Sequence, residues 1–143
     1  MSCNRINLSE AIKFHGHLGP YLVLGLLMGT YALRNLKAKK YFGLEVKVKG
    51  AYKKPKSCLI DGLQLSTGAT FGKGNINKLN GKDIQVTVYN IHNKRKVTLS
   101  LKDSLKFQLA KLKSHRDSEV FAIKIYRRNC NKLFKLTPIT QNP

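Results

Sequence analysis

The sequence contains no tryptophan, only three cysteines and only seven acidic side chains against 27 basic ones. Cys3, Cys58 and Cys130 are an odd number without framework spacing, which argues against a small secreted scaffold held by disulfides. The cysteine content instead predicts a protein of the reducing cytoplasm, whose fold is not stabilised by disulfides.

Long hydrophobic runs are also missing. The longest apolar stretch covers residues 21–33, which is shorter than the ~20 residues that a membrane-spanning helix needs. Gly25 and Gly29 lie four residues apart in it, a spacing that lets another backbone approach a helix closely. We therefore expect a buried helix, no membrane association and no signal peptide, because no small-residue cleavage pattern follows the apolar stretch.

The shortage of acidic residues leaves a formal net charge of +20. Such a field attracts anionic partners unless salt screens it. The excess is mostly lysine, dispersed from Lys37 to Lys135. This pattern favours weak, non-specific nucleic-acid binding at low salt over specific recognition, because few arginines are present to make forked contacts to phosphate or guanine.

The chain of 143 residues has the size of one domain, and no linker or internal repeat divides it. We expect a single domain, residues 1–143, of the α+β class, with an antiparallel or mixed sheet covered by helices. Helices are predicted at residues 9–15, 20–33, 58–66, 103–113 and 117–128, and strands at 44–49, 84–89, 97–101 and 133–136. Residues 84–101 have the pattern of an antiparallel hairpin with a basic tip at 92–95.

Two short polar clusters carry the functional signal. Residues 14–20 read Phe-His-Gly-His-Leu-Gly-Pro, with the histidines at the corner between two predicted helices. Residues 58–75, CLIDGLQLSTGATFGKGN, hold a thiol, a carboxylate, an amide and a glycine-lysine-glycine loop. Ser57 is a suitable N-cap for the helix that begins at Cys58, and the positive end of the helix dipole is expected to favour a thiolate there.

These clusters resemble the FmdE family, which is named after a subunit of formylmethanofuran dehydrogenase. Its pattern is His-Gly-His-x-Cys-Pro-Gly, followed by Cys-x-x-Asp-Ala-Ile-Gln-x-x-Thr-Gly-Cys-Thr-x-Gly-Lys-Gly-Asn. The matching residues are His15, Gly16, His17, Pro20, Cys58, Asp61, Gln64, Thr67, Gly68, Thr70, Gly72, Lys73, Gly74 and Asn75. The similarity spans about residues 10–90 and weakens toward the chain end.

Two family cysteines are absent, since Gly19 and Ala69 stand in their places. We also expect no C-terminal cysteine-rich zinc module of the kind found in some members, because Cys130 is the only cysteine after residue 75. The resemblance implies a metal-binding α+β domain that pairs as a homodimer. The loss of two thiols also allows a degenerate member that has kept the fold without the chemistry.

Three side chains are candidate ligands for zinc or another transition metal: His15, His17 and Cys58. His17 and Cys58 form the best pair, while His15 can instead cap its helix or satisfy a buried hydrogen bond. A closed structural zinc site has four protein ligands, so water, Asp61 or another group must complete this one. Asp61 and Gln64 share a helix face, from which they can support ligands or line a pocket.

The glycine loop offers backbone amides and one cation to a small anion. Phosphate, a carboxylate or a pterin-like anion would suit it, and the residues expected to form this pocket are Gln64, Thr67, Gly72, Lys73, Gly74 and Asn75. The loop lacks the spacing of a nucleotide-hydrolysing P-loop.

Three classes of function remain open: a metal-binding accessory or small-ligand-binding protein, an enzyme and a basic nucleic-acid-binding module. The enzyme would use a metal, or Cys58 with His17 as base and Asp61 as orienting group, for hydrolysis or group transfer. His92 and His115 are interpreted as exposed residues without a role.

Overall fold

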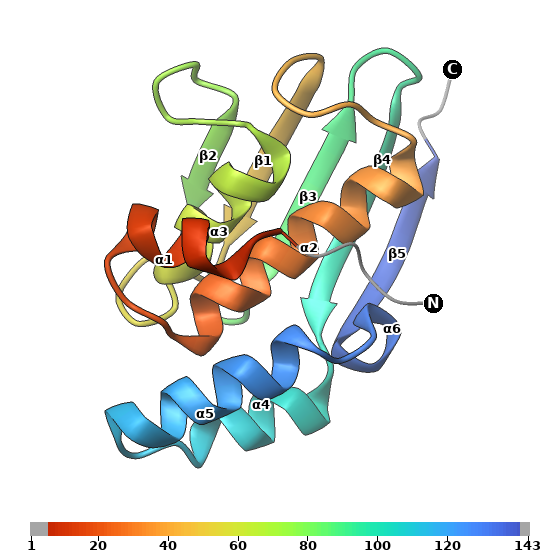
Figure 1. Cartoon of the computed structure of the whole chain (residues 1–143). Coiled ribbons are helices and arrows are strands. Elements are labelled where there is room, and N and C mark those ends of the chain that lie inside the picture. Colours follow the sequence, from red (N-terminus) through yellow and green to blue (C-terminus); the bar gives the residue numbers. More distant parts are fainter. Residues whose placement is uncertain (1–5, 141–143) are drawn as a thin grey trace.

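The computed structural model of the chain describes residues 6–140. Its helices are α1 (Leu8–His15), α2 (Pro20–Leu36), α3 (Cys58–Thr67), α4 (Asp103–Ala110), α5 (His115–Tyr126) and α6 (Cys130–Leu133). Its strands are β1 (Leu44–Lys49), β2 (Ile76–Leu79), β3 (Gln85–Asn90), β4 (Arg95–Leu101) and β5 (Phe134–Thr140). The five strands form one sheet in the order β2-β1-β3-β4-β5 (Figure 1).

The sheet is mixed. β1 and β2 run parallel, whereas β1–β3, β3–β4 and β4–β5 are antiparallel. The parallel pair requires a crossover, and α3 supplies it between β1 and β2. The predicted α+β class is therefore confirmed, in its mixed form.

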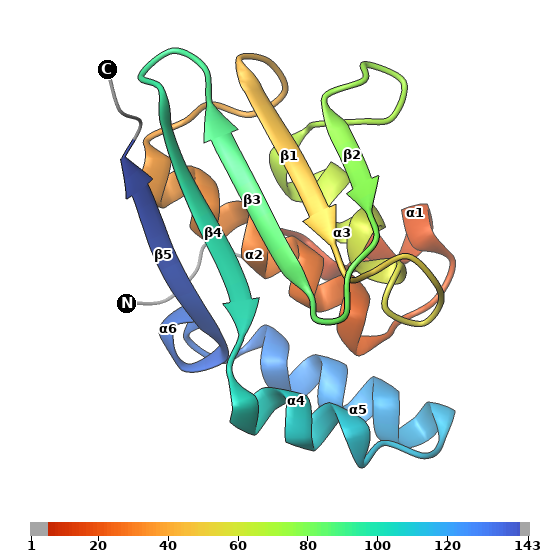
Figure 2. The same ribbon diagram turned by 180° about the vertical axis from the view of Figure 1, so that it is seen from behind.

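Helices cover one face of this sheet. Leu44, Val46 and Val48 of β1 are buried, while the residues between them are exposed, which is the period-two pattern of a half-buried strand. α1, α2 and α3 lie over the buried face, and in the described part of the chain the opposite face has no covering helix (Figure 2). That open face is polar at its centre, where the hydroxyl groups of Thr87 on β3 and Thr98 on β4 form a hydrogen bond of 3.0 Å.

The close crossing of α2 and α3 depends on glycine. A Cβ on Gly25 would overlap the carbonyl oxygen of Leu59, and a Cβ on Gly62 would overlap that of Leu22. Ser66 of α3 donates a hydrogen bond to the Gly25 carbonyl at 3.0 Å, so the two backbones are also joined directly. The predicted close packing at the glycine pair of α2 is confirmed, and its partner is α3.

Several element boundaries differ from the prediction. α4 ends at Ala110, three residues early, and Asp103 is its first residue while Lys102 occupies the N-cap. α5 begins at His115, because the Ser114 hydroxyl accepts a hydrogen bond from the Asp117 amide and thereby caps it. β2 and α6, each of four residues, were not predicted.

The expectation of a fold without disulfides is wrong. Cys130 is disulfide-bonded and Cys58 is free. The cysteine content therefore no longer argues for a reducing compartment. Between residues 6 and 140, none of the helices has the length and apolar character needed to span a membrane.

We expect Gly62→Ala to lower the free energy of unfolding by about 3 kcal/mol, measured by urea denaturation. The added methyl group meets backbone atoms of α2, including the Leu26 nitrogen at 2.7 Å, so the helices must separate. Gly72→Ala is the control, because the nearest atom to its Cβ is the Thr70 hydroxyl oxygen at 3.9 Å. Equal stability of the two variants would contradict the glycine-dependent crossing.

Candidate metal centre

The two histidines lie at the corner between α1 and α2. His15 is the last residue of α1, and Gly16 ends the helix in a left-handed conformation with φ 104°. Gly19 is the extended N-cap of α2, and Pro20 occupies its first turn. This short connection holds the imidazoles of His15 and His17 against each other, with ring centroids 4.5 Å apart.

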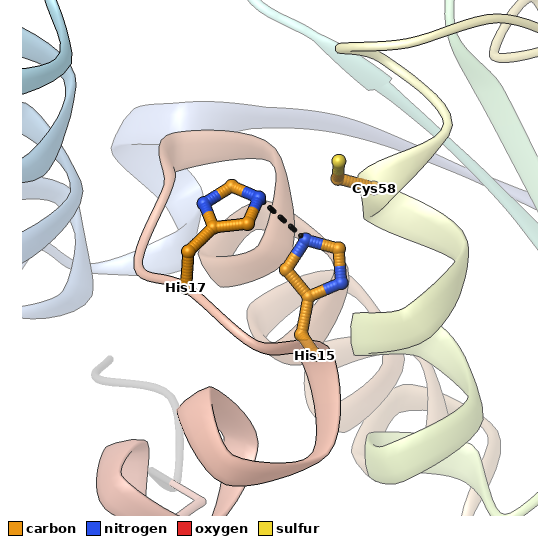
Figure 3. Close-up of side chains that lie close together, drawn as sticks. All are labelled: His15, His17 and Cys58. Atoms are coloured by element: carbon orange, nitrogen blue, oxygen red, sulfur yellow. Dashed lines mark hydrogen bonds between the residues drawn. The ribbon is translucent and has the colours of Figure 1, made fainter.

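Cys58 reaches the same place from the first turn of α3. One donor atom from each of His15, His17 and Cys58 lies within 4.8 Å of the others. Figure 3 shows the two rings side by side, with the cysteine approaching from α3. The three predicted ligands, which belong to two distant segments of the chain, are thus brought together.

The spacing of the donor atoms suits a tetrahedral metal ion. The two Nε2 atoms are 3.0 Å apart, and two nitrogens that both bind zinc at 2.0–2.1 Å lie roughly 3.3 Å apart. Two imidazoles and a thiolate are borderline and soft ligands of the kind that zinc and related metals accept. The residues present therefore fit a metal with three protein ligands and one open position.

Asp61 fixes the orientation of His15. Its Oδ2 lies 2.6 Å from Nδ1 of His15, and an ionised carboxylate can only accept, so Nδ1 carries the proton. Nε2 of a neutral His15 then presents its lone pair toward His17. A carboxylate on the far nitrogen of a ligating imidazole is the usual supporting arrangement at metal sites. The hypothesis that Asp61 orients His17 is not supported, because the structure places this carboxylate on His15.

The expectation that Cys58 favours a thiolate is wrong for the metal-free protein. Burial raises the pKa of the Cys58 thiol, and the Asp61 carboxylate raises it further, whereas Lys54 acts in the opposite direction. Ser57 does occupy the N-cap of α3, but its side chain makes no capping hydrogen bond. A metal that binds Cys58 must therefore displace a proton.

A cavity of about 260 Å³ opens beside this cluster. His17 and Cys58 line one part of it, and the α4–α5 hairpin contributes Leu112, His115 and Ser118. His115 is exposed, as expected from the sequence, and it also lines this cavity. The serine cap at Ser114 was the available signal, since it places His115 in the first turn of a helix.

A family model described as "FmdE, Molybdenum formylmethanofuran dehydrogenase operon" matches residues 14–136. The chain belongs to the FmdE family. The crystal structure of a protein similar to FmdE of tungsten formylmethanofuran dehydrogenase, from Syntrophus aciditrophicus, is 25% identical, with a TM-score of 0.69. That similarity covers 100% of this chain and 79% of the other. No curated protein matches the chain.

The two positions at which this chain lacks an FmdE cysteine have different surroundings. A Cβ on Gly19 would lie 3.3 Å from Cε1 of His17, so a cysteine there would lie beside the three candidate ligands. Ala69 is fully buried and follows the C-terminal end of α3, about 15 Å along the helix from Cys58. Of the two departures, only Gly19 removes a potential ligand from this site.

The FmdE glycine loop is held together by the residues that sequence reasoning assigned to an anion pocket. Gln64 accepts from the Phe71 amide at 3.1 Å, and Asn75 accepts from the Thr70 amide at 3.0 Å. The buried Thr67 hydroxyl accepts from the Ala69 amide at 3.1 Å, where the chain leaves α3 for the loop. These three side chains therefore shape the loop, whatever it binds.

Lys73 bonds within the same loop. Its ammonium group donates to the Gly68 carbonyl, and its Nζ lies 5.4 Å above the ring of Phe42. An ammonium has three donors, so an anion would compete with only part of this arrangement. Gly72 and Gly74 are exposed, and Gly74 has φ 75°. The anion pocket stays a prediction.

In the metal-free protein, we expect Cys58 to titrate above the ordinary thiol pKa. Alkylation of Cys58 by iodoacetamide across a pH series, followed by peptide mass spectrometry, measures this pKa. Asp61→Asn should lower the pKa and speed alkylation near pH 8, whereas Lys54→Met should raise it. Because the folded pKa exceeds the unfolded one, thiol ionisation should destabilise the fold as pH rises through this range. A wild-type Cys58 pKa below that of free cysteine would contradict the predicted effects of burial and of Asp61.

Proposed function

We propose that this FmdE domain is a metal-binding accessory or small-ligand-binding protein. His15, His17 and Cys58 hold one zinc or related transition-metal ion, and Asp61 orients His15. The observation that carries the proposal is the convergence of three suitable donors within 4.8 Å, together with the Asp61 contact to the far nitrogen of His15. Within residues 6–140, no other group of three or more such residues meets this criterion.

The open coordination position supports a role in exchange or catalysis. A structural zinc site is usually closed by four protein ligands, whereas sites that bind water or substrate have three. Gly19 removes the nearest candidate for a fourth ligand, and the cavity beside His17 and Cys58 gives a small molecule access. Metal bound here would supply a Lewis acid. Turnover of a substrate would separate an enzyme from an accessory protein.

Wild-type protein reconstituted with zinc should contain about one metal ion per chain, measured by elemental mass spectrometry. Cys58→Ala and His17→Ala should lose it, because each removes one of three ligands. Asp61→Asn should keep the site but weaken zinc affinity about 10–100-fold in a chelator competition, since the orientation of His15 is lost. Gly19→Cys should strengthen binding by adding a thiolate beside His17.

His92→Ala is the matched control, because His92 is an exposed histidine at the β3–β4 turn. Its zinc content should equal that of the wild type. Wild-type protein that takes up neither zinc nor iron would overturn the proposal and would favour a degenerate FmdE member. Equal loss of metal from His92→Ala would show non-specific uptake.

A second candidate function is weak binding of single-stranded nucleic acid. The net charge of +20 is joined by three exposed aromatic rings around the glycine loop: Tyr41, Phe42 and Phe71. The hydrogen bond from Asn75 to the Tyr41 carbonyl ties the first of these segments to the loop. Lysines beside rings, as at Lys73 and Phe42, combine a cation with a stacking surface for bases.

If this surface binds single strands, Phe42→Ala should weaken binding of a fluorescent oligothymidylate about fivefold or more, because one stacking ring is lost. Fluorescence anisotropy at low salt measures the change, and affinity should fall steeply as salt rises. Phe107→Ala is the control, since Phe107 is similarly exposed and lies under Lys111 on α4. An equal effect of both substitutions would reject the stacking surface and leave only charge attraction.

The homodimer and the cytoplasmic location implied at the sequence level also stay predictions. Light scattering of the purified full chain decides the first. Fractionation of the native cells decides the second.

A further inference from the structure

The cavity beside the candidate ligands His15, His17 and Cys58 has one side with metal-binding groups and another with apolar side chains. His17 and Cys58, two of the three candidate ligands, lie on one side. The apolar side chains of Leu18, Leu109 and Leu112 line other parts of the cavity. A molecule bound here would contact the open metal position and an apolar surface together. Ligand sites in proteins commonly combine an apolar lining with a few polar groups in this way.

The volume sets the size of this molecule. The cavity measures about 260 Å³, slightly below the ~300 Å³ at which most ligand pockets begin. At about 30 Å³ for each water-sized group, it has room for roughly nine non-hydrogen atoms. A short organic molecule of this size fits inside the cavity.

The charges favour a singly charged anion. A divalent metal with one thiolate and two neutral imidazoles carries a net charge of +1, and the Asp61 carboxylate, which contacts His15 but does not line the cavity, offsets this charge from behind. Among residues 6–140, those that line the cavity include no aspartate, glutamate, lysine or arginine. A phosphate dianion would lack the cationic side chains it normally recruits, whereas a single carboxylate requires only the open metal position.

The hairpin supplies polar groups on the side away from α3. His115 and Ser118 lie one turn apart at the N-terminal end of α5, and both line the cavity. This end of the helix carries the positive pole of the dipole, which adds to the attraction for an anion. Asp117 lies in the same turn but is exposed and does not line the cavity.

We propose that the cavity between the His15–His17–Cys58 cluster and the α4–α5 hairpin binds a small aliphatic monocarboxylate. Its carboxylate occupies the open metal position and contacts His115, and its chain lies against Leu18, Leu109 and Leu112. This inference rests on the metal site proposed above. It adds the class of ligand and gives His115 a role in binding it.

The test uses full-length protein loaded with one zinc per chain, titrated calorimetrically with hexanoate, which has eight non-hydrogen atoms. Acetate carries the same head without the chain, and hexanol carries the chain without the charge. Hexanoate should bind at least about tenfold more tightly than either, because both the metal and the apolar wall contribute. Cobalt-loaded protein should change its visible spectrum with hexanoate, since the carboxylate enters the coordination sphere.

His115→Gln should weaken hexanoate binding about tenfold and leave the zinc content at one per chain. His92→Gln, outside the cavity, should change neither quantity. Zinc-loaded wild type that binds hexanoate no better than acetate would overturn this inference and leave the metal site standing. A wild type that takes up no zinc would overturn both, and the separate zinc measurement distinguishes the two failures.

Discussion

The glycine-dependent approach of α2 and α3 is the constraint on which the rest of the structure depends. Gly25 and Gly62 let the two backbones meet, and the Ser66 hydroxyl ties them together. Because α2 begins directly after the histidine corner and α3 begins at Cys58, the distance between the helices decides whether three donors converge. A packing requirement in the core therefore sets the geometry of a partly exposed site.

Asp61 connects this site to the glycine loop. One carboxylate oxygen contacts His15, the other lies 3.5 Å from the Gln64 amide, and Gln64 in turn holds the Phe71 amide of the loop. The FmdE motif residues thus form one continuous set of contacts along α3, from His15 to the glycine loop. The negative charge that supports His15 also makes the neighbouring Cys58 thiol harder to ionise.

Patterns within one element were predictable. The alternating residues 44–49 form β1 with the expected bounds, and His15, Gly16 and Pro20 end one helix and begin the next as expected. β2 was not predictable, since it has four residues of which only Ile76 is buried, and its strand pairing is with β1. α5 begins two residues before the predicted position 117, because Ser114 caps it.

The sequence by itself determined the family, the candidate ligands and the absence of two family thiols, because these are matters of residue type and local spacing. Tertiary structure decided that Asp61 contacts His15, that Gly19 lies beside His17 while Ala69 lies in the core, and that His115 lines the cavity. Most of these relations are between residues on different helices or connections. Their distances depend on how the helices pack on each other and on the sheet, which the spacing of residues along the chain does not encode.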